Sequence, residues 1–119
     1  MSKPFPDTDL ILASASPRRA ELLRQIGVRF TIHPADIDET QYPNEAPEDY
    51  VQRLAREKAQ AVAQQLLDIK LPVLGADTTV VLDNRIFSKP ADKSEAIATL
   101  RALSGRSHRV LSAIAVVAE

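Results

Sequence analysis

Short apolar runs alternate with longer amphipathic stretches along this chain, and that alternation limits its possible folds more than any other feature. Leu10–Ala13 has the composition of a short buried strand. Ser16 and Pro17 then predict the start of a helix, because serine suits the N-cap and proline the first helical position. The helix is expected to stop at Gly27, and residues 28–33 to form a second strand. Strands separated by helices predict an α/β sheet that is covered on both faces.

The rest of the chain continues this alternation. The second half is predicted to contain a loop at 34–46, a helix from Pro47 to about Leu67, a strand at 72–76, a hairpin at 78–82 and 85–87, a helix that ends before Gly105, and a final strand at 110–117. Asp92, followed three residues later by Glu95, resembles the capping box that starts such a helix.

Composition narrows the functional classes. The chain has 119 residues, of which 45% are hydrophobic and 26% are charged, as in a globular protein and unlike a disordered one. With no cysteine, disulfides, zinc-thiolate sites and thiol nucleophiles are excluded. A net charge of −1 argues against binding to a nucleic acid polymer. We see neither a signal peptide nor an apolar run long enough to span a membrane, so we expect a cytoplasmic protein.

Two arginines stand where a helix disfavours them. Arg18 and Arg19 fall in the first turn of the first helix, where each cation costs about 0.3–1 kcal/mol. Free backbone N–H groups, the helix dipole and two guanidinium groups would together form a phosphate receptor. Alternatively both arginines point into solvent, where the cost is small. The sequence leaves these two interpretations even.

Lys58 interrupts the apolar stripe of the long helix. It lies four residues after Leu54 and four before Val62, both of which belong to that stripe. A lysine on a buried face must extend to solvent, pair with an acid or line a cavity. Extension to solvent is the commonest of these outcomes, but Lys58 is also a candidate phosphate ligand.

Asp77 follows an apolar strand directly after two small residues, of which Gly75 would let a ligand approach the backbone. Ligands of open α/β sheets bind outside the carboxyl ends of the strands, so Asp77 is a candidate general base or metal ligand. The alternative is an aspartate that only stabilises a turn.

Acidic residues also gather in the first long loop, at positions 36, 38 and 39. Carboxylates are the ligands of magnesium and manganese, although most such clusters are simply solvated. A GxxxxGK[ST] phosphate-binding loop does not occur, which argues against an ordinary P-loop ATPase or kinase.

Several segments together resemble the Maf family of nucleotide pyrophosphatases. They are LILASASPRRAELL at 10–23, DIDE at 36–39, REKA at 56–59, GADTTV at 75–80, SKP at 88–90 and LSGRSH at 103–108. The resemblance implies a mixed sheet flanked by helices, in a Maf-like (inosine triphosphatase-like) α/β fold with a central cleft. It also implies a divalent metal, Mg or Mn, and a nucleoside triphosphate substrate that is cut to monophosphate and pyrophosphate.

The resemblance also implies roles for individual residues. Asp77 would be the catalytic base, and Glu39 with Asp77 would hold the metal. The residues that would bind substrate are Ser14, Arg18, Arg19, Lys58, Thr78 and Lys89. All but Thr78 would contact phosphate, and Arg18 and Thr78 would help to select the base. The SPRR and GADT forms resemble the branch that acts on dTTP and UTP, with modified nucleotides as further candidate substrates.

Length is the departure from the family. Maf proteins continue well beyond residue 119, so we expect 1–119 to be a single, truncated Maf-like domain that lacks the C-terminal part of the fold. The final strand is apolar on both faces, which predicts an interior strand with layers above and below it. We therefore expect a poorly soluble or self-associated chain with little turnover. The alternatives are a non-catalytic nucleotide-binding protein and a septum-formation regulator, and a homodimer stays open.

Overall fold

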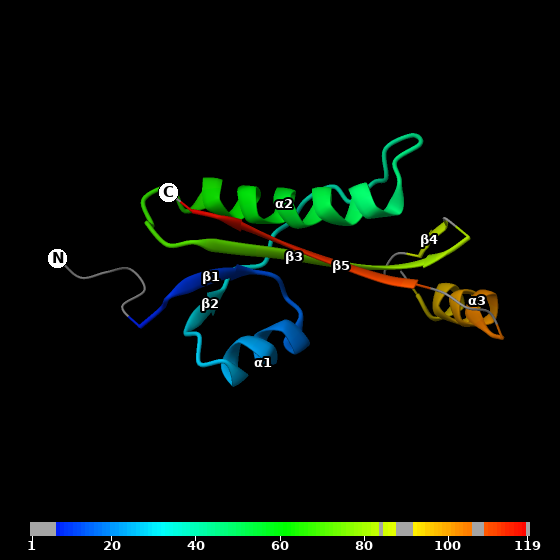
Figure 1. Cartoon of the computed structure of the whole chain (residues 1–119), viewed down its shortest axis with the longest axis horizontal. Helices are drawn as coiled ribbons and strands as arrows, with labels where there is room; N and C mark the ends of the chain where they lie inside the picture. Colours follow the sequence, from blue (N-terminus) through cyan, green and yellow to red (C-terminus); the bar gives the residue numbers. More distant parts are fainter. Residues whose placement is uncertain (1–6, 84, 88–91, 106–108, 119) are drawn as a thin grey trace.

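The computed structural model describes residues 7–83, 85–87, 92–105 and 109–118. In chain order its elements are β1 (Leu10–Ala13), α1 (Pro17–Gln25), β2 (Phe30–Ile32), α2 (Pro47–Gln65), β3 (Val73–Leu82), β4 (Arg85–Phe87), α3 (Lys93–Leu103) and β5 (Arg109–Val117). Figure 1 shows α2 along one side of the sheet and α1 on the other, with α3 at the far end of the long strands. The α/β fold expected from the alternation is confirmed.

Local signals start and stop the helices as predicted. The Ser16 side chain caps α1 by accepting from a backbone N–H, and Gly27 follows the helix with a φ of 78°. Asp92 caps α3 through the backbone N–H of Glu95, at 2.8 Å. None of the helices in the described ranges is long and apolar enough to cross a lipid bilayer.

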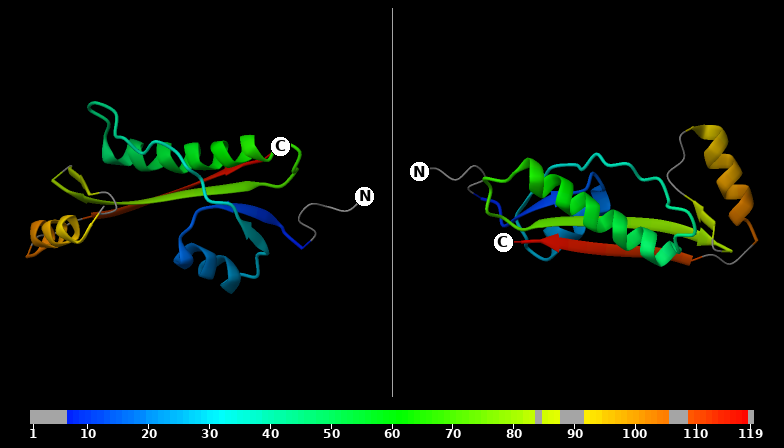
Figure 2. Two further views of the ribbon diagram at one scale, coloured as in Figure 1. Left: turned by 180° about the vertical axis from the view of Figure 1, so that it is seen from behind. Right: turned by 90° about the horizontal axis from the view of Figure 1, so that it is seen from above.

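The five strands form one mixed sheet around β3. β1 pairs in parallel with β2 and with the first third of β3, and β4 forms an antiparallel hairpin with the end of β3. β5 runs antiparallel beside almost the whole of β3, from Val73 opposite Val117 to Val81 opposite Arg109. The views in Figure 2 show β3 and β5 as a long, twisted two-stranded ribbon.

β3 differs from the prediction. Residues 72–76 and 78–82 were expected to form two strands, with Asp77 at the end of the first, but β3 is continuous and Asp77 lies in its middle. The reason is the pairing with β5, which supplies backbone partners on both sides of Asp77. β1, however, ends at Ala13 opposite Gly75. Asp77 therefore still lies just beyond the carboxyl end of a strand, that of β1.

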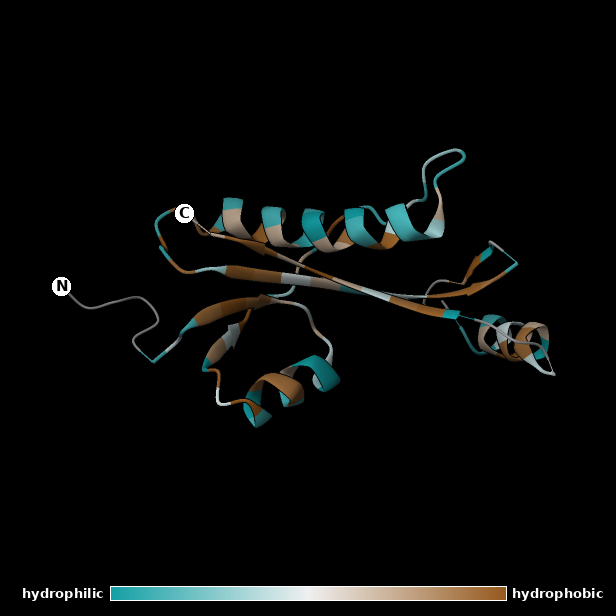
Figure 3. Ribbon diagram, in the orientation of Figure 1, coloured by the Kyte–Doolittle hydropathy of each residue, from teal (hydrophilic) through white to brown (hydrophobic). Residues whose placement is uncertain are grey.

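Gly75 brings α2 close to β3. A Cβ atom at this position would lie 2.2 Å from the Ala55 carbonyl oxygen and 2.6 Å from the Ala59 nitrogen. The space beside Gly75 is thus filled by the helix, and the expectation that a ligand approaches there is wrong. Between α2 and the sheet lies a cluster of buried apolar residues, Ile11, Ala13, Ala59, Val62 and Val73. Figure 3 shows the apolar side of α2 turned to the sheet and its polar side turned outward.

β5 is covered on one face. Its odd-numbered residues from Leu111 to Val117 are half-buried on the face toward α2, whereas Val110, Ile114 and Val116 on the other face are 59–72% exposed. Within the described residues β5 pairs with β3 alone. In the described part of the chain β5 is therefore an edge strand with one apolar face exposed. The expectation of covering layers on both faces concerned the untruncated fold and stays a prediction. The ribbon also makes the chain elongated, with a radius of gyration of 16.3 Å against about 13.5 Å for a compact domain of this length.

Candidate functional site

A cavity of about 520 Å³ lies beyond the carboxyl end of β1, among the start of α1, the loop after β2, the middle of α2 and the middle of β3. Its lining includes six residues that the sequence singled out: Ser14, Arg19, Glu39, Lys58, Asp77 and Thr78. These residues come from four separate segments of the chain. The fold therefore gathers most of the predicted site into one cavity.

Lys58 reaches inward from α2. Its Nζ lies 3.1 Å from Asp77 Oδ1 and 3.5 Å from Glu39 Oε1, and its side chain is only 17% exposed. Of the three outcomes left open for a lysine in the apolar stripe, the structure thus combines two, pairing with an acid and lining a cavity. One ammonium group is shared by two carboxylates from different elements, so the three side chains form a charge cluster with a net charge of −1.

Both carboxylate oxygens of Asp77 have partners. Oδ1 faces the Lys58 ammonium, and Oδ2 accepts a hydrogen bond of 3.0 Å from the Thr79 hydroxyl. Asp77 and Thr79 point to the same side of β3 because side chains alternate along a strand, and both are buried. Sequence reasoning missed Thr79, although its spacing of two residues from Asp77 on a strand was the available signal.

The start of α1 separates the two arginines. The Arg19 guanidinium donates to Thr78 Oγ1 at 2.5 Å and to Ser14 Oγ at 3.3 Å, which directs it along the cavity wall. Arg18 is exposed and lines a neighbouring groove between α1 and the outer face of β3 and β5. Arg19 therefore lies at the cavity and Arg18 is exposed at the neighbouring groove, and a phosphate contact by either arginine stays a prediction.

Arg19 contacts hydroxyl groups rather than carboxylates in the described part of the chain. Across the described part of the chain, no carboxylate lies within ion-pair distance of Arg19. Its partners are hydroxyl groups, and its own backbone N–H belongs to the first turn of a helix, where the dipole is positive. A cation of this kind beside a cavity favours an anionic ligand.

The site can contribute two carboxylates to a divalent cation. Glu39 and Asp77 already converge on one positive charge, and a hard cation such as Mg²⁺ commonly takes one or two carboxylates plus water and phosphate oxygens. No group of three or more His, Cys, Asp or Glu is close enough to bind a metal anywhere in the described ranges. Asp38 instead accepts from the backbone N–H and the hydroxyl of Thr40, and these hydrogen bonds lower the pKa of Asp38. The residues present fit a metal that is shared with a substrate.

Lys89, the remaining predicted phosphate ligand, lies outside the described residues. Its role stays a prediction.

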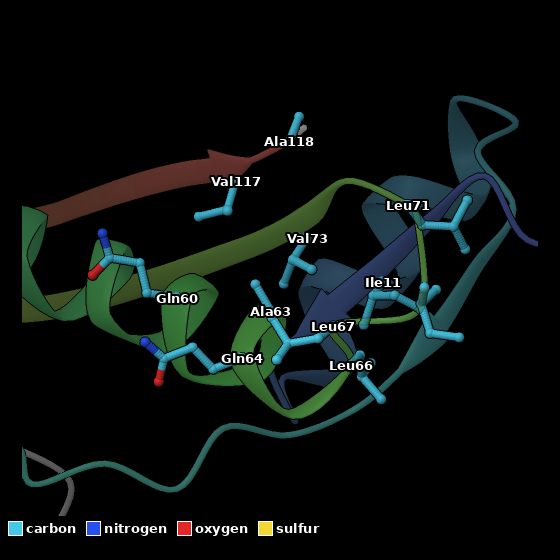
Figure 4. A pocket seen from close by; sticks show the side chains of 11 residues that line it. Ile11, Gln60, Ala63, Gln64, Leu66, Leu67, Leu71, Val73, Val117 and Ala118 are labelled. Atoms are coloured by element: carbon cyan, nitrogen blue, oxygen red, sulfur yellow. The ribbon is translucent and has the colours of Figure 1, made fainter.

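A second cavity, of about 450 Å³, differs in character. It lies by the C-terminal end of α2, and Figure 4 shows the apolar side chains of Ile11, Leu66, Leu71 and Val73 around it, together with the amides of Gln60 and Gln64. Of the described residues that line it, none is charged. Without a cation this cavity does not suit a polyphosphate, so the charge cluster at Lys58 is the candidate site.

Comparisons with known proteins find a family model and curated relatives that match most of this chain. The model of the family described as "Maf-like protein" matches residues 9–119. The chain is 57% identical over 109 residues to a dTTP/UTP pyrophosphatase of Methylobacillus flagellatus, a match that covers 92% of this chain and 55% of the relative. It is 58% identical over 111 residues to a dTTP/UTP pyrophosphatase of Alcanivorax borkumensis, covering 92% and 57%. The chain thus spans about half the length of the curated relatives it matches.

Among solved structures, a nucleoside-triphosphatase / dITP/XTP pyrophosphatase from Mycobacterium abscessus aligns with a TM-score of 0.46 and 18% identity, over 92% of this chain and 64% of that one.

Proposed function

The chain belongs to the Maf-like protein family, and we propose that it hydrolyses nucleoside triphosphates to the monophosphate and pyrophosphate, with dTTP and UTP as substrates. The observation that carries the proposal is the position of Lys58. An inward-facing ammonium lies between two carboxylates, beside an arginine whose side-chain partners among the described residues are hydroxyl groups. Together these groups offer both the cations and the base that phosphate hydrolysis needs.

Charge neutralisation is the first task of the site. A triphosphate carries about four negative charges, and these repel an attacking water until cations balance them. Arg19 and Lys58 supply two cations, and the Ser14 hydroxyl, whose oxygen accepts from the Ser16 N–H and from Arg19, has its own proton to donate to phosphate. In the free protein Lys58 is held by carboxylates, so substrate phosphate would compete with them for its N–H groups.

Asp77 is proposed as the base. Water attacks phosphorus, the bond between the α- and β-phosphates breaks, and the proton of the attacking water passes to Asp77 Oδ1. That atom becomes available when the Lys58 ammonium turns to phosphate, while the Thr79 hydroxyl keeps Oδ2 in place. Glu39 and Asp77 would hold Mg²⁺ or Mn²⁺, which when bound neutralises phosphate charge and lowers the pKa of water.

Selectivity for the base is proposed to involve Thr78 and Arg18. Thr78 lies on the opposite side of β3 from Asp77, and its hydroxyl contacts both Arg19 and Ser112. Arg18 is exposed beside the same strand face. The two residues therefore lie next to the groove beyond the phosphate-binding cations, where the rest of a nucleotide would extend.

The decisive experiment compares Asp77→Asn with Asp68→Asn, an exposed aspartate beyond the C-terminal end of α2. Pyrophosphate release is measured from dTTP, UTP and a panel of other nucleotides, with Mg²⁺ or Mn²⁺. We expect Asp77→Asn to keep nucleotide binding and to lose turnover by about 10²-fold or more, as the loss of a general base does. Asp68→Asn should match the unmodified chain.

Equal turnover in both variants would refute the role of Asp77. Saturable nucleotide binding by the unmodified chain, with no pyrophosphate release for any nucleotide, would instead indicate a binding protein without catalysis.

A further inference from the structure

The loop that carries Glu39 is fastened to α2 by two side chains that the proposed function does not use. We propose that Tyr50 and Arg53 are positioning residues, which hold Glu39 where its carboxylate can face Lys58 and Asp77. The inference rests on the proposed function, since it concerns how one metal-binding carboxylate of that site is placed.

The two side chains bind consecutive carbonyl groups of the loop. Tyr50 Oη donates to the carbonyl oxygen of Glu39 at 2.7 Å, and Arg53 Nη2 donates to the carbonyl oxygen of Thr40 at 3.0 Å. Residues three apart on a helix lie on the same face, so one face of α2 meets both carbonyls. Residues 33–46 form neither helix nor strand, and these hydrogen bonds give two of the loop's carbonyl groups a partner.

Arg53 is itself held rigidly. Its guanidinium makes five hydrogen-bond contacts: Nε and Nη2 donate to the two Glu45 oxygens, Nη2 also donates to the Thr40 carbonyl, and Nη1 faces both oxygens of Glu57. The side chain is only 8% exposed, and the Tyr42 ring stacks on it at 3.8 Å. The hydrogen bonds to Glu45 raise the pKa of Arg53.

Glu39 needs this support because its own side chain is weakly held. The Glu39 side chain is 55% exposed, and its contact with Lys58 is a long one, 3.5 Å. Exposed ion pairs of this kind fix a side chain poorly. The hydrogen bonds to the Glu39 and Thr40 carbonyl groups therefore fix the backbone from which the Glu39 side chain extends. The Tyr50 ring is buried and lines the cavity, so its hydrogen bond to Glu39 holds the loop at the cavity.

The test compares two tyrosine-to-phenylalanine variants of the full chain. Tyr50→Phe removes the hydroxyl that binds the Glu39 carbonyl and keeps the ring. Tyr42→Phe is the matched control, because the Tyr42 ring is 55% exposed and its hydroxyl makes no hydrogen bond to the described residues. Mn²⁺ affinity is measured by electron paramagnetic resonance with Mn²⁺ alone, and the metal dependence of pyrophosphate release is measured beside it.

We expect Tyr50→Phe to weaken Mn²⁺ binding and to raise the metal concentration for half-maximal turnover by about 10-fold, the usual cost of losing a residue that orients a metal ligand. Tyr42→Phe should leave both quantities unchanged. In a Glu39→Gln background, Tyr50→Phe should have no further effect on either quantity, because a residue that acts through Glu39 loses its influence with that carboxylate.

Two results overturn the inference and leave the proposed function intact: equal Mn²⁺ affinity in Tyr50→Phe and Tyr42→Phe, or an effect of Tyr50→Phe that persists in full without Glu39. Failure of the unmodified chain to bind Mn²⁺ also overturns it. If the unmodified chain binds Mn²⁺ but releases no pyrophosphate, the proposed function is refuted, and the Mn²⁺ titrations alone decide the role of Tyr50.

Discussion

Substituting Gly75 by alanine tests the packing that places Lys58 opposite Asp77. The added Cβ would meet the Ala55 carbonyl oxygen at 2.2 Å, the Ala59 nitrogen at 2.6 Å and the Ala59 Cβ at 2.9 Å. Two of these three atoms belong to the helix backbone, which cannot rotate away as a side chain can. The contact can therefore be relieved only if α2 moves off β3.

The expected cost is at least that of ordinary overpacking. Inserting one methyl group into a packed core costs about 1–3 kcal/mol, and we expect about 3 kcal/mol here because the backbone must shift. For a domain of this size that lowers the melting temperature by about 10 °C or more. Since Lys58 precedes Ala59 on α2, the same shift should lengthen its contact with Asp77 and reduce turnover.

Thermal and urea denaturation of three variants measure this effect. Gly75→Ala should be the least stable single variant. Gly27→Ala, where a Cβ meets open space but φ is 78°, should lose only about 1–2 kcal/mol from backbone strain. Adding Ala59→Gly to Gly75→Ala should restore little, because it removes only one of the three close contacts. The reasoning would be refuted if Gly75→Ala melted at the same temperature as the unmodified protein, or if adding Ala59→Gly fully restored the stability of Gly75→Ala.

Two further predictions concern the charged groups. Lys58→Met should weaken nucleotide binding. Because it leaves the buried Asp77 carboxylate without its ammonium partner, it should also lower the free energy of unfolding by about 1–3 kcal/mol. The helix pattern alone predicts unchanged or higher stability, and urea denaturation beside a nucleotide titration distinguishes these two predictions. Hydrogen bonds from Arg53 hold the pKa of Glu45 below its usual value of 4.5, so their contribution to stability is complete above that pH and is lost as the pH falls through the lowered value. The free energy of unfolding, measured between neutral pH and pH 3, should accordingly fall less steeply with acid in Glu45→Gln than in the unmodified chain. Parallel pH dependences of the two proteins would contradict this assignment.

The helices and most of the strands could be predicted because their signals are local. Ser16 and Pro17 start α1 and Gly27 follows it, and these effects act within one helical turn. The inward direction of Lys58 was also visible, since the 3.6-residue period of a helix assigns each residue to a face. The sequence by itself therefore determined the order of the elements and the residues able to carry the chemistry.

Which side chains contact one another was decided only by the tertiary structure. The contact of Lys58 with Asp77 spans 19 residues and that of Arg19 with Thr78 spans 59, so each depends on how α1 and α2 pack on the sheet. β3 is one strand because β5 pairs along it, although residues 75–77 alone suggested an end. The burial of Arg53 likewise depends on the loop before α2, which brings the Thr40 carbonyl and the Glu45 carboxylate to its guanidinium. A helical or strand period specifies a direction for each side chain, but what lies in that direction depends on packing between segments far apart in the chain.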